Sequence, residues 1–455
     1  MKTLLRNLLV ILLSLTISQK LTAQCNGVGN GTDGGIYYLY ADTNIDDLCL
    51  GGNFITSGAD TLNHCGFCND TSFIPLGMTG YYGTDDSVWC ILYFNGNMYY
   101  GGSFINAGGT AANYIALWDG SAWHPVGNGF NGTVRCLAAY QGNLYAGGEF
   151  TMSGVATVNH LAEWTGTQWV QPGNGLNNAA YTMYTWNGNL YIGGSFTSAG
   201  STPANYICAW NGSAYTALGS GLTFSMMRTP AVYALSLYKG ELWAGGMFDH
   251  AGSIGASNLA KWDGSNWSSA GDIGTGMNSD AVWALCVYDS ALYAGGSFGM
   301  CGSQSASNIG AWDGSNWSTI GTGFNGTVHA LAVYHKKLYL GGLFTSAAGT
   351  TVSNIASYDR ITGIIPSSAK KDVLKLYPNP AHTSFTVSWS QNINAPPTFK
   401  LYDITGNKVL EKNLGTTMAG NHIITIDAHN LNAGIYIYSF NTGNSLYNGK
   451  VSLIK

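Results

Sequence analysis

The chain has 455 residues, of which only 9% are charged, and its formal net charge at pH 7 is -5. Binding to nucleic acid requires clustered lysine and arginine to neutralise phosphates, so this composition disfavours a nucleic-acid partner. After the first residues, no apolar stretch is long enough to cross a bilayer as a helix. We therefore expect no transmembrane span and a surface that is polar but mostly uncharged.

Residues 1–23 have the pattern of a secretory signal peptide. Lys2 and Arg6 supply the positive start, Leu8 to Ile17 form a short apolar stretch, and Ala23 is a small residue at the expected cleavage point. The following Cys25 suggests a lipoprotein as an alternative, but Gln24 is not the small residue that lipidation favours. The segment predicts export.

A Gly-Gly pair, followed one residue later by Phe, recurs seven times at a nearly constant period. Subtracting the positions of successive first glycines gives steps of 50, 46, 46, 52, 50 and 46 residues, and a period of this length is typical of four-stranded propeller blades. We predict an all-β chain with a seven-bladed propeller over residues 25–364. The first glycines of the pairs are Gly51, Gly101, Gly147, Gly193, Gly245, Gly295 and Gly341.

Turn residues divide each unit into four strands, as the second unit illustrates. Val88 to Phe94 and Met98 to Gly102 flank Asn95-Gly96, a strong two-residue hairpin signal. Tyr114 to Trp118 follows a longer loop, and a fourth strand begins near Trp123. Glycine inside a strand is costly, so the repeated pair indicates close approach of another backbone. Two tryptophans flank the second hairpin turn of most units, and we expect them to pack between blades.

The seventh unit lacks its fourth strand, and a matching segment stands at the opposite end of the chain. The string Val-Gly-Asn-Gly at 28–31 repeats the string at 126–129, which follows a fourth strand. We therefore predict that residues 25–31 complete the seventh blade, which leaves no blade with an unpaired edge.

These repeats resemble those of kelch-like and galactose-oxidase-like propellers, which also end the second strand in Gly-Gly. The chain departs from kelch repeats by placing Trp-Asp-Gly at the third strand and by lacking a recurrent arginine. The resemblance implies the fold, but it transfers no function.

A polar linker at 365–372 separates the repeats from a short strand-rich region at 373–455. Segments such as Phe385 to Trp389 and Ile435 to Phe440 alternate with turn residues, which predicts a small immunoglobulin-like β-sandwich.

The motifs of this region resemble the type A sorting domain of the type IX secretion system. The residues that carry the resemblance are Tyr377, Pro378, Asn379 and Pro380, then Gly406 and Gly434 within their motifs, and the last segment from Lys450 to Lys455. The resemblance implies a Bacteroidota-type outer membrane, the type IX secretion machinery and its surface peptidase as partners, and a location outside the cell, reached through the periplasm. An ordinary immunoglobulin-like module is the alternative.

Cys65 and Cys68 replace the usual Trp-Asp-Gly string in the first unit. We predict a local disulfide between them, with Cys49 as a competing partner. A zinc site is the weaker alternative, because a single Cys-x-x-Cys pair has too few ligands.

Propeller function usually gathers where loops open around the central channel. The second residue of each innermost strand is large, and it is aromatic in five of the seven units. We predict that these side chains line a ligand-binding funnel for a glycan or a protein, and the alternative is that the rings pack between blades. The residues are Tyr37, Trp89, Arg135, Tyr181, Tyr233, Trp283 and His329.

Catalytic signals are weak in this chain. Glu149 is an acid with no structural explanation, and His329 with His160 and His250 is the one conceivable copper set. We predict a binding or adhesion module with no catalytic residue, cofactor or metal, and we keep a polysaccharide hydrolase or lyase as the alternative function.

Overall fold

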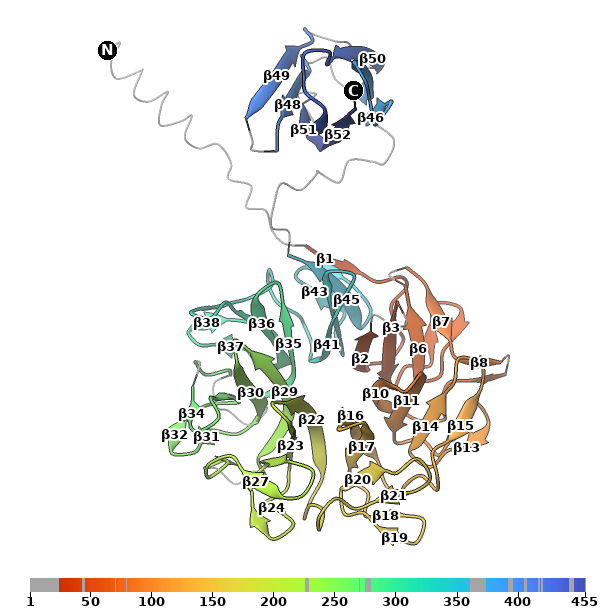
Figure 1. Ribbon diagram of the computed structural model, residues 1–455, viewed down its shortest axis with the longest axis vertical. Helices are drawn as coiled ribbons and strands as arrows, with labels where there is room; N and C mark the ends of the chain where they lie inside the picture. The colour runs from red at the N-terminus through yellow and green to blue at the C-terminus, as the bar shows by residue number, and fades with distance from the viewer. Residues whose placement is uncertain are drawn as a thin grey trace. The chain divides into compact units, whose positions relative to one another are not determined.

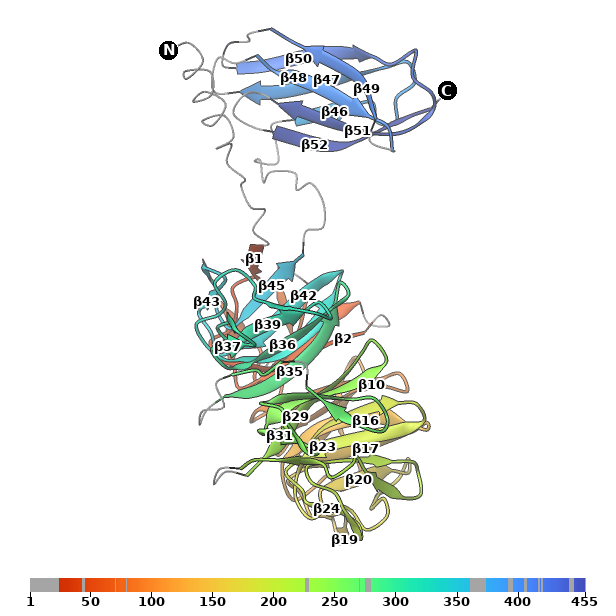
Figure 2. The same ribbon diagram turned by 90° about the vertical axis from the view of Figure 1, so that its left-hand side faces the viewer.

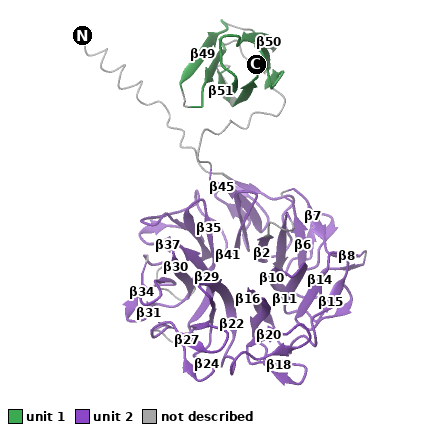
Figure 3. Ribbon diagram, in the orientation of Figure 1, with its two compact units in different colours: residues 1–21, 361–455 green, residues 22–360 purple. Residues whose placement is uncertain are grey.

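The computed structural model describes residues 24–454, except 43–45, 70, 79, 226–228, 270, 275–279, 361–373, 392–395, 405–406, 416–417, 419 and 442–445. The chain divides into two compact units, one over 22–360 and one over 361–455 together with 1–21 (Figure 3). The predicted signal peptide, the predicted linker, Gly406 and Lys455 lie outside the described residues. The domain limits at 364 and 373 fall there too and stay predictions.

The larger unit is a seven-bladed β-propeller, as the repeats predict. Seven four-stranded antiparallel sheets surround a central axis, and one strand of each sheet faces that axis (Figure 1). The innermost strands are β2 (Ile36–Asp42), β10 (Val88–Phe94), β16 (Val134–Tyr140), β22 (Ala180–Trp186), β29 (Ala231–Tyr238), β35 (Ala281–Tyr288) and β41 (Val328–Tyr334).

The second, third and fourth strands follow outward in every blade. The second strands are β3 (Asp47–Gly52), β11 (Asn97–Gly102), β17 (Asn143–Gly148), β23 (Asn189–Gly194), β30 (Glu241–Met247), β36 (Ala291–Ser297) and β42 (Lys337–Gly342). The third strands are β6 (Cys65–Cys68), β14 (Ile115–Trp118), β20 (Leu161–Trp164), β26 (Ile207–Trp210), β33 (Leu259–Trp262), β39 (Ile309–Trp312) and β45 (Ile355–Asp359). The fourth strands are β7 (Phe73–Pro75), β15 (Trp123–Pro125), β21 (Trp169–Val170), β27 (Tyr215–Ala217), β34 (Trp267–Ser268), β40 (Trp317–Ser318) and β1 (Gln24–Gly27).

In each blade, the loop between the second and third strands contains a small hairpin made of two strands of two residues each. The blade 2 hairpin pairs β12 (Asn106–Ala107) with β13 (Thr110–Ala111), and the blade 6 hairpin pairs β37 (Met300–Cys301) with β38 (Gln304–Ser305). The remaining pairs are β4 (Thr56–Ser57) with β5 (Asp60–Thr61), β18 (Met152–Ser153) with β19 (Ala156–Thr157), β24 (Ser198–Ala199) with β25 (Thr202–Pro203), β31 (His250–Ala251) with β32 (Ile254–Gly255) and β43 (Ser346–Ala347) with β44 (Thr350–Thr351). β28 (Leu222–Thr223) joins β31, and β8 (Gly77–Met78) pairs with β9 (Tyr81–Tyr82).

The N-terminal strand closes the ring, as the matching strings predict. β1 pairs antiparallel with β45, with Gln24 opposite Asp359 and Gly27 opposite Ala356. The strand spans 24–27, and the rest of the predicted 25–31 segment forms the turn that follows it. Cys25 and Val28 are only 1% and 2% exposed. The two ends of the propeller therefore share one sheet, so blade 7 has four strands like the other blades and β45 is not its outer edge.

Both glycines of the repeated pair occupy positions where a larger residue would overlap its neighbours. A Cβ on Gly101 would lie 2.5 Å from Val134 Cγ1 of the next blade, and one on Gly341 would lie 2.6 Å from Ile36 Cγ2 across the closure. A Cβ on the second glycine, Gly102, would collide with the carbonyl oxygen of Ser87 in its own blade. The first glycine thus admits a side chain of the neighbouring blade, and the second admits a backbone, as predicted.

The tryptophan pairs pack between blades, as expected. Trp118 and Trp123 lie with ring centroids 5.3 Å apart. The indole N–H of Trp123 donates to Leu76 O of the preceding blade, and Trp169 and Trp267 donate likewise to Val126 O and Leu218 O. These bonds satisfy buried indole groups and fix the spacing of neighbouring blades.

The predicted disulfide between Cys65 and Cys68 is wrong: the two thiols are not joined. Both side chains are fully buried, but they lie in different core clusters, Cys65 with residues such as Val88 and Cys68 with residues such as Ile36. The physical reason is that residues three apart on a strand point to opposite faces. Blade 1 therefore holds one cysteine on each face.

The C-terminal unit is the predicted sandwich of antiparallel strands (Figure 2). One sheet has the order β46-β47-β50 and the other the order β49-β48-β51-β52. Phe385, Trp389 and Phe440 are among the buried side chains between them. The strands are β46 (Leu374–Tyr377), β47 (Ser384–Gln391), β48 (Thr398–Tyr402), β49 (Lys408–Asn413), β50 (Gly420–Asp427), β51 (Gly434–Asn441) and β52 (Leu446–Leu453). Across the residues that the structure describes, we find no helix with the length and hydropathy of a membrane span.

Candidate functional site

A cavity of about 590 Å³ lies at the centre of the innermost strands. All seven predicted funnel side chains line it, one from each blade, and all seven are half-buried. Neighbouring blades therefore do not enclose these rings completely, as the alternative of packing between blades would require. We call the seven side chains the belt: Tyr37, Trp89, Arg135, Tyr181, Tyr233, Trp283 and His329.

A β-bulge places each belt residue. In blade 2, Val88 pairs with Gly102 and Cys90 pairs with Gly101, so Trp89 is the extra residue between them. The same register shift falls at the belt position of every innermost strand. A bulge bends the strand and redirects the side chain of the extra residue. The Gly-Gly pair lies directly opposite the bulge, which links the repeated motif to the belt.

Belt residues of neighbouring blades contact one another around most of the ring. Tyr37 and Trp89 stack with centroids 4.4 Å apart and planes at 6°, and Arg135 Cζ lies 4.1 Å from the Trp89 centroid. On the other side, Tyr233 stacks on Trp283 at 4.1 Å. Further contacts join Tyr181 to Tyr233 and join His329 to both Trp283 and Tyr37, with centroids 5.4–5.5 Å apart.

These contacts change what the belt can offer a ligand. A ring and a guanidinium both stacked on Trp89 must occupy opposite faces of the indole, so neither face is open. The sequence suggested that the rings stack on a ligand. For Trp89 the structure instead leaves the ring edge for a ligand, and the hydroxyl groups of Tyr37, Tyr181 and Tyr233 are polar groups of the belt that can contact one.

Arg135 is paired with Glu149, the acid that the sequence left unexplained. The Arg135 Nε and Nη2 atoms donate to Glu149 Oε1 at 2.9 and 2.7 Å, and both residues line the cavity. Glu149 directly follows the Gly-Gly pair of its blade, and at the same place in blade 2 Ser103 accepts a bond from Trp89 Nε1 at 3.0 Å. Residues after the Gly-Gly pair thus support the belt, a pattern that the repeat alignment could have revealed.

Burial determines the protonation of His329. Desolvation lowers the pKa of this imidazole to about 4, which leaves it neutral at pH 7. Burial, together with nearby Tyr181, raises the pKa of Tyr233 to about 12 despite the charge of Arg135. Because Arg135 forms an ion pair with Glu149, the belt and Glu149 together carry no net charge at neutral pH.

Next to the belt, a layer of aliphatic side chains lines the cavity. Two residues beyond the belt position, six of the seven blades line the cavity with a leucine or a methionine. The sequence interpretation missed this layer, although strand alternation would have found it at the same spacing from every belt residue. The residues are Leu39, Leu137, Met183, Leu235, Leu285 and Leu331.

The histidines considered for copper do not converge. His329 lines the cavity, whereas neither His160 nor His250 does. His160 Nδ1 contacts Gly148 O, and His250 Nδ1 contacts Asp249 Oδ1 at 2.7 Å. Within the described parts of the chain, no three His, Cys, Asp or Glu residues group closely enough to hold a metal ion.

In the C-terminal unit, the first predicted motif contacts the last strand. Asn379 Nδ2 donates to Lys450 O at 3.1 Å, and Asn379 Oδ1 accepts from Ser452 N at 2.9 Å. Ala381 exchanges backbone bonds with Ser452 and Ile454. Gly434 begins β51, and Tyr377 ends β46. The motif around Pro378 and Pro380 and the terminal segment therefore form one structural unit.

A family model described as a secretion system C-terminal sorting domain matches residues 375–454. The C-terminal unit is thus a sorting domain of the type IX secretion system, as its motifs predict. The protein is accordingly a type IX cargo that is exported to the cell surface or the medium, and it engages the secretion machinery through this domain.

Comparisons of the whole chain are more distant. PorZ, a surface component of the type IX secretion system of Porphyromonas gingivalis, is 13% identical, with a TM-score of 0.45, and the match covers 94% of this chain and 60% of that one. The GH74 enzyme of Niastella koreensis is 12% identical, with a TM-score of 0.38 and coverages of 95% and 74%. An arabinoxylan arabinofuranohydrolase of family 43 from Bacillus subtilis is 11% identical, with a TM-score of 0.23 and coverages of 80% and 95%. No curated sequence matches, and the kelch-like character of the repeats stays a prediction.

Proposed function

We propose that the exported propeller is a recognition module that binds a neutral glycan in the cavity inside the belt. The observation that carries this proposal is the convergence of seven bulged side chains, one from each blade, on a single cavity. Bulges cost ladder hydrogen bonds, and they are common where a side chain must be redirected next to a functional site.

The chemistry of the belt favours an uncharged polar ligand. Tyrosine hydroxyls and the remaining N–H groups of Arg135 can exchange hydrogen bonds with sugar hydroxyls, and the aliphatic wall can accept an apolar sugar face. An anionic ligand would meet Glu149, whose carboxylate already occupies two donors of Arg135. Binding through hydroxyl groups is the better match.

A polysaccharide hydrolase or lyase is the less supported alternative. Glycosidases generally need two carboxyl groups on either side of the scissile bond. Among the described residues that line the cavity, Glu149 is the one carboxylate, and it is held by Arg135. A recognition role requires no second acid.

We also propose the route that the sorting domain implies. Residues 1–23 direct the chain to the periplasm of a Bacteroidota-type cell, and the outer-membrane machinery then moves it outward. A surface peptidase removes the sorting domain, which leaves the propeller attached or released. Fusing residues 366–455 to a periplasmic reporter tests this route, and retention of the reporter in the periplasm of a competent host would contradict it.

Glycan-array binding by the exported protein tests the recognition role. We expect Trp89→Ala and Trp283→Ala to lose at least tenfold in affinity, because each removes a ring on which its belt neighbours stack. Tyr81→Ala is the control, since it removes an aromatic side chain that is 61% exposed and does not line the cavity. Turnover of a bound glycan would favour the hydrolase or lyase, and unchanged binding in both tryptophan variants would reject the belt as the site.

A further inference from the structure

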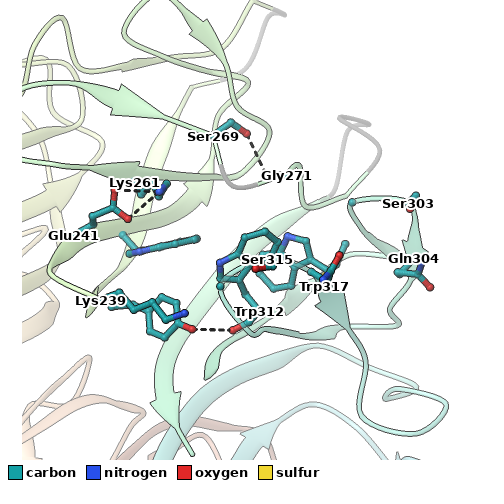
Figure 4. Close-up of a pocket in the computed structure, with 16 residues that line it drawn as sticks. Lys239, Glu241, Lys261, Ser269, Gly271, Ser303, Gln304, Trp312, Ser315 and Trp317 are labelled. Carbon is teal, nitrogen blue, oxygen red and sulfur yellow. Dashed lines mark hydrogen bonds and ion pairs between the residues drawn. The ribbon is translucent and has the colours of Figure 1, made fainter. Parts of the chain in front are cut away.

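A second cavity, of about 560 Å³, lies between blades 5 and 6, and it shares no lining residue with the belt cavity. Figure 4 shows the Glu241–Lys261 pair on one side, Trp312 and Trp317 on the other, and Gln304 at one end. Its volume falls within the range of about 300–1,000 Å³ that is usual for small-ligand sites. We call this cavity the groove.

The blade 5 side of the groove differs from the matching surface of other blades. Trp243 stands where five sister blades have tyrosine, namely Tyr99, Tyr145, Tyr191, Tyr293 and Tyr339. This indole is 1% exposed, and its buried Nε1 has no hydrogen-bond partner among the described residues. Lys261 Nζ lies 2.8 and 3.0 Å from the two carboxylate oxygens of Glu241, and both side chains are about one quarter exposed. A charged pair is therefore present at the wall of the groove and reachable from solvent.

The blade 6 side presents a partly exposed indole. Trp312 is half-buried, as is the equivalent Trp164 of blade 3, whereas Trp118, Trp210 and Trp262 at the same position are only 4–8% exposed. The outer loops approach these indoles differently.

At two other blade interfaces, a loop glycine lies against the corresponding tryptophan. A Cβ on Gly127 would lie 2.7 Å from Trp164, and one on Gly173 would lie 3.3 Å from Trp210. The equivalent Gly271 instead lies against Trp317. Gly271 therefore does not lie against Trp312, although Trp164 is half-buried even with Gly127 against it.

From these observations we propose that the groove binds a neutral saccharide, independently of the belt. The apolar face of a sugar ring fits against an accessible indole such as Trp312. The Glu241 carboxylate can accept a hydrogen bond and the Lys261 ammonium can donate one, so the pair can bind two neighbouring hydroxyl groups of a sugar. A phosphate or carboxylate ligand would meet the Glu241 carboxylate, which already pairs with Lys261. Lys239 keeps its charge, but its Nζ already donates to the backbone oxygen Asp313 O.

Calorimetric titration of the full-length protein with neutral hexasaccharides of glucose, mannose and xylose tests this proposal. We expect at least one of them to bind, and we expect Trp312→Ala to weaken that binding at least tenfold. Glu241→Gln keeps the shape of the wall but breaks the ion pair, and it should weaken binding about fivefold. Trp164→Ala is the matched control, because it removes the equivalent indole of blade 3.

The belt variant Trp283→Ala separates this proposal from the proposed function. Binding that persists in Trp283→Ala and is lost in Trp312→Ala supports the groove, even if the belt binds nothing. Binding that Trp312→Ala and Glu241→Gln both retain would overturn the proposal. The proposal would also fail if Trp164→Ala weakens binding as much as Trp312→Ala, or if no hexasaccharide binds at millimolar concentration.

Discussion

Two layers of residues lie next to each other around the propeller axis, and they differ in how far their side chains vary between blades. The first glycines of the repeated pairs are identical in all seven blades, and six of the seven meet a β-branched residue of the next blade. The belt residues, which lie opposite these glycines, include tyrosine, tryptophan, arginine and histidine. The glycine layer is uniform, whereas the belt is not.

The difference has a physical origin. The glycine layer sets the distance between blades, and a single Cβ there would overlap a neighbour. A bulged residue leaves the strand ladder, so its side chain faces the cavity, where several shapes fit. Uniform positions therefore define the ring, and variable positions are free to define what the ring binds.

Removal of residues 24–31 should have the largest effect on the propeller, because the glycine layer closes only if blade 7 is complete. The deletion exposes β45 and removes the burial of Cys25 and Val28, each of which contributes about 1.5–3 kcal/mol. We expect a loss of about 5 kcal/mol and a melting temperature lower by on the order of 10 °C. Calorimetry of the intact and shortened propellers measures the two melting temperatures. Equal values would show that β1 does not stabilise the closed ring.

Gly101→Ala should have the next largest effect, since it tests the uniform layer directly. The added Cβ would lie 2.5 Å from Val134 Cγ1 and 2.6 Å from Cys90 Sγ, an overlap that costs about 3 kcal/mol. Gly255→Ala is the matched control because a Cβ there would have no neighbour within 4 Å, and we expect it to be neutral or slightly stabilising. Denaturant unfolding of both variants compares them, and equal stabilities would refute the steric role of the pair.

Much of this architecture follows from local sequence. Turn residues such as Asn95-Gly96 fix the hairpins, and the matched strings at 28–31 and 126–129 reveal the closure. The belt positions follow from aligning the innermost strands. Each of these signals is a short string inside one repeat, so comparing the repeats reveals it even at the closure, where the paired strands are far apart in the chain.

Other features depend on contacts that spacing does not encode. The bulges require the register between two strands, and the partial exposure of Trp312 depends on how side chains of two blades pack around it. Cys65 and Cys68 look like a local pair until the strand containing both is known, because alternation then places them on opposite faces. Sequence therefore predicts the ring better than it predicts which parts of its surface stay open.

The belt should respond to pH where the glycine layer does not. The folded-state pKa of His329 lies at about 4, below the unfolded value of about 6.5, so the neutral ring favours the folded state. Its contribution is complete above pH 6.5 and is lost as the pH falls through 4, and it amounts to about 3 kcal/mol at most. We expect the difference in unfolding free energy between the parent and His329→Gln to shrink over that range. A difference that stays constant from pH 7 to pH 4 would contradict the burial of a neutral imidazole.

The smallest effect on stability should come from one position in the rim loops. This position is Asp33 before blade 1 and Asn131 before blade 3, and both side chains accept the same backbone hydrogen bonds. Asp33 Oδ1 accepts from the backbone N–H groups of Ile55 and Thr56 at 2.8 and 2.9 Å, and Asn131 makes the same two bonds in blade 3. Because an amide oxygen serves equally well there, Asp33→Asn should change the unfolding free energy by less than about 0.5 kcal/mol. Asp33→Ala removes the acceptor and should cost about 1 kcal/mol. Denaturant unfolding of the two variants separates geometry from charge: if Asp33→Asn costs as much as Asp33→Ala, the negative charge rather than the acceptor position stabilises this loop.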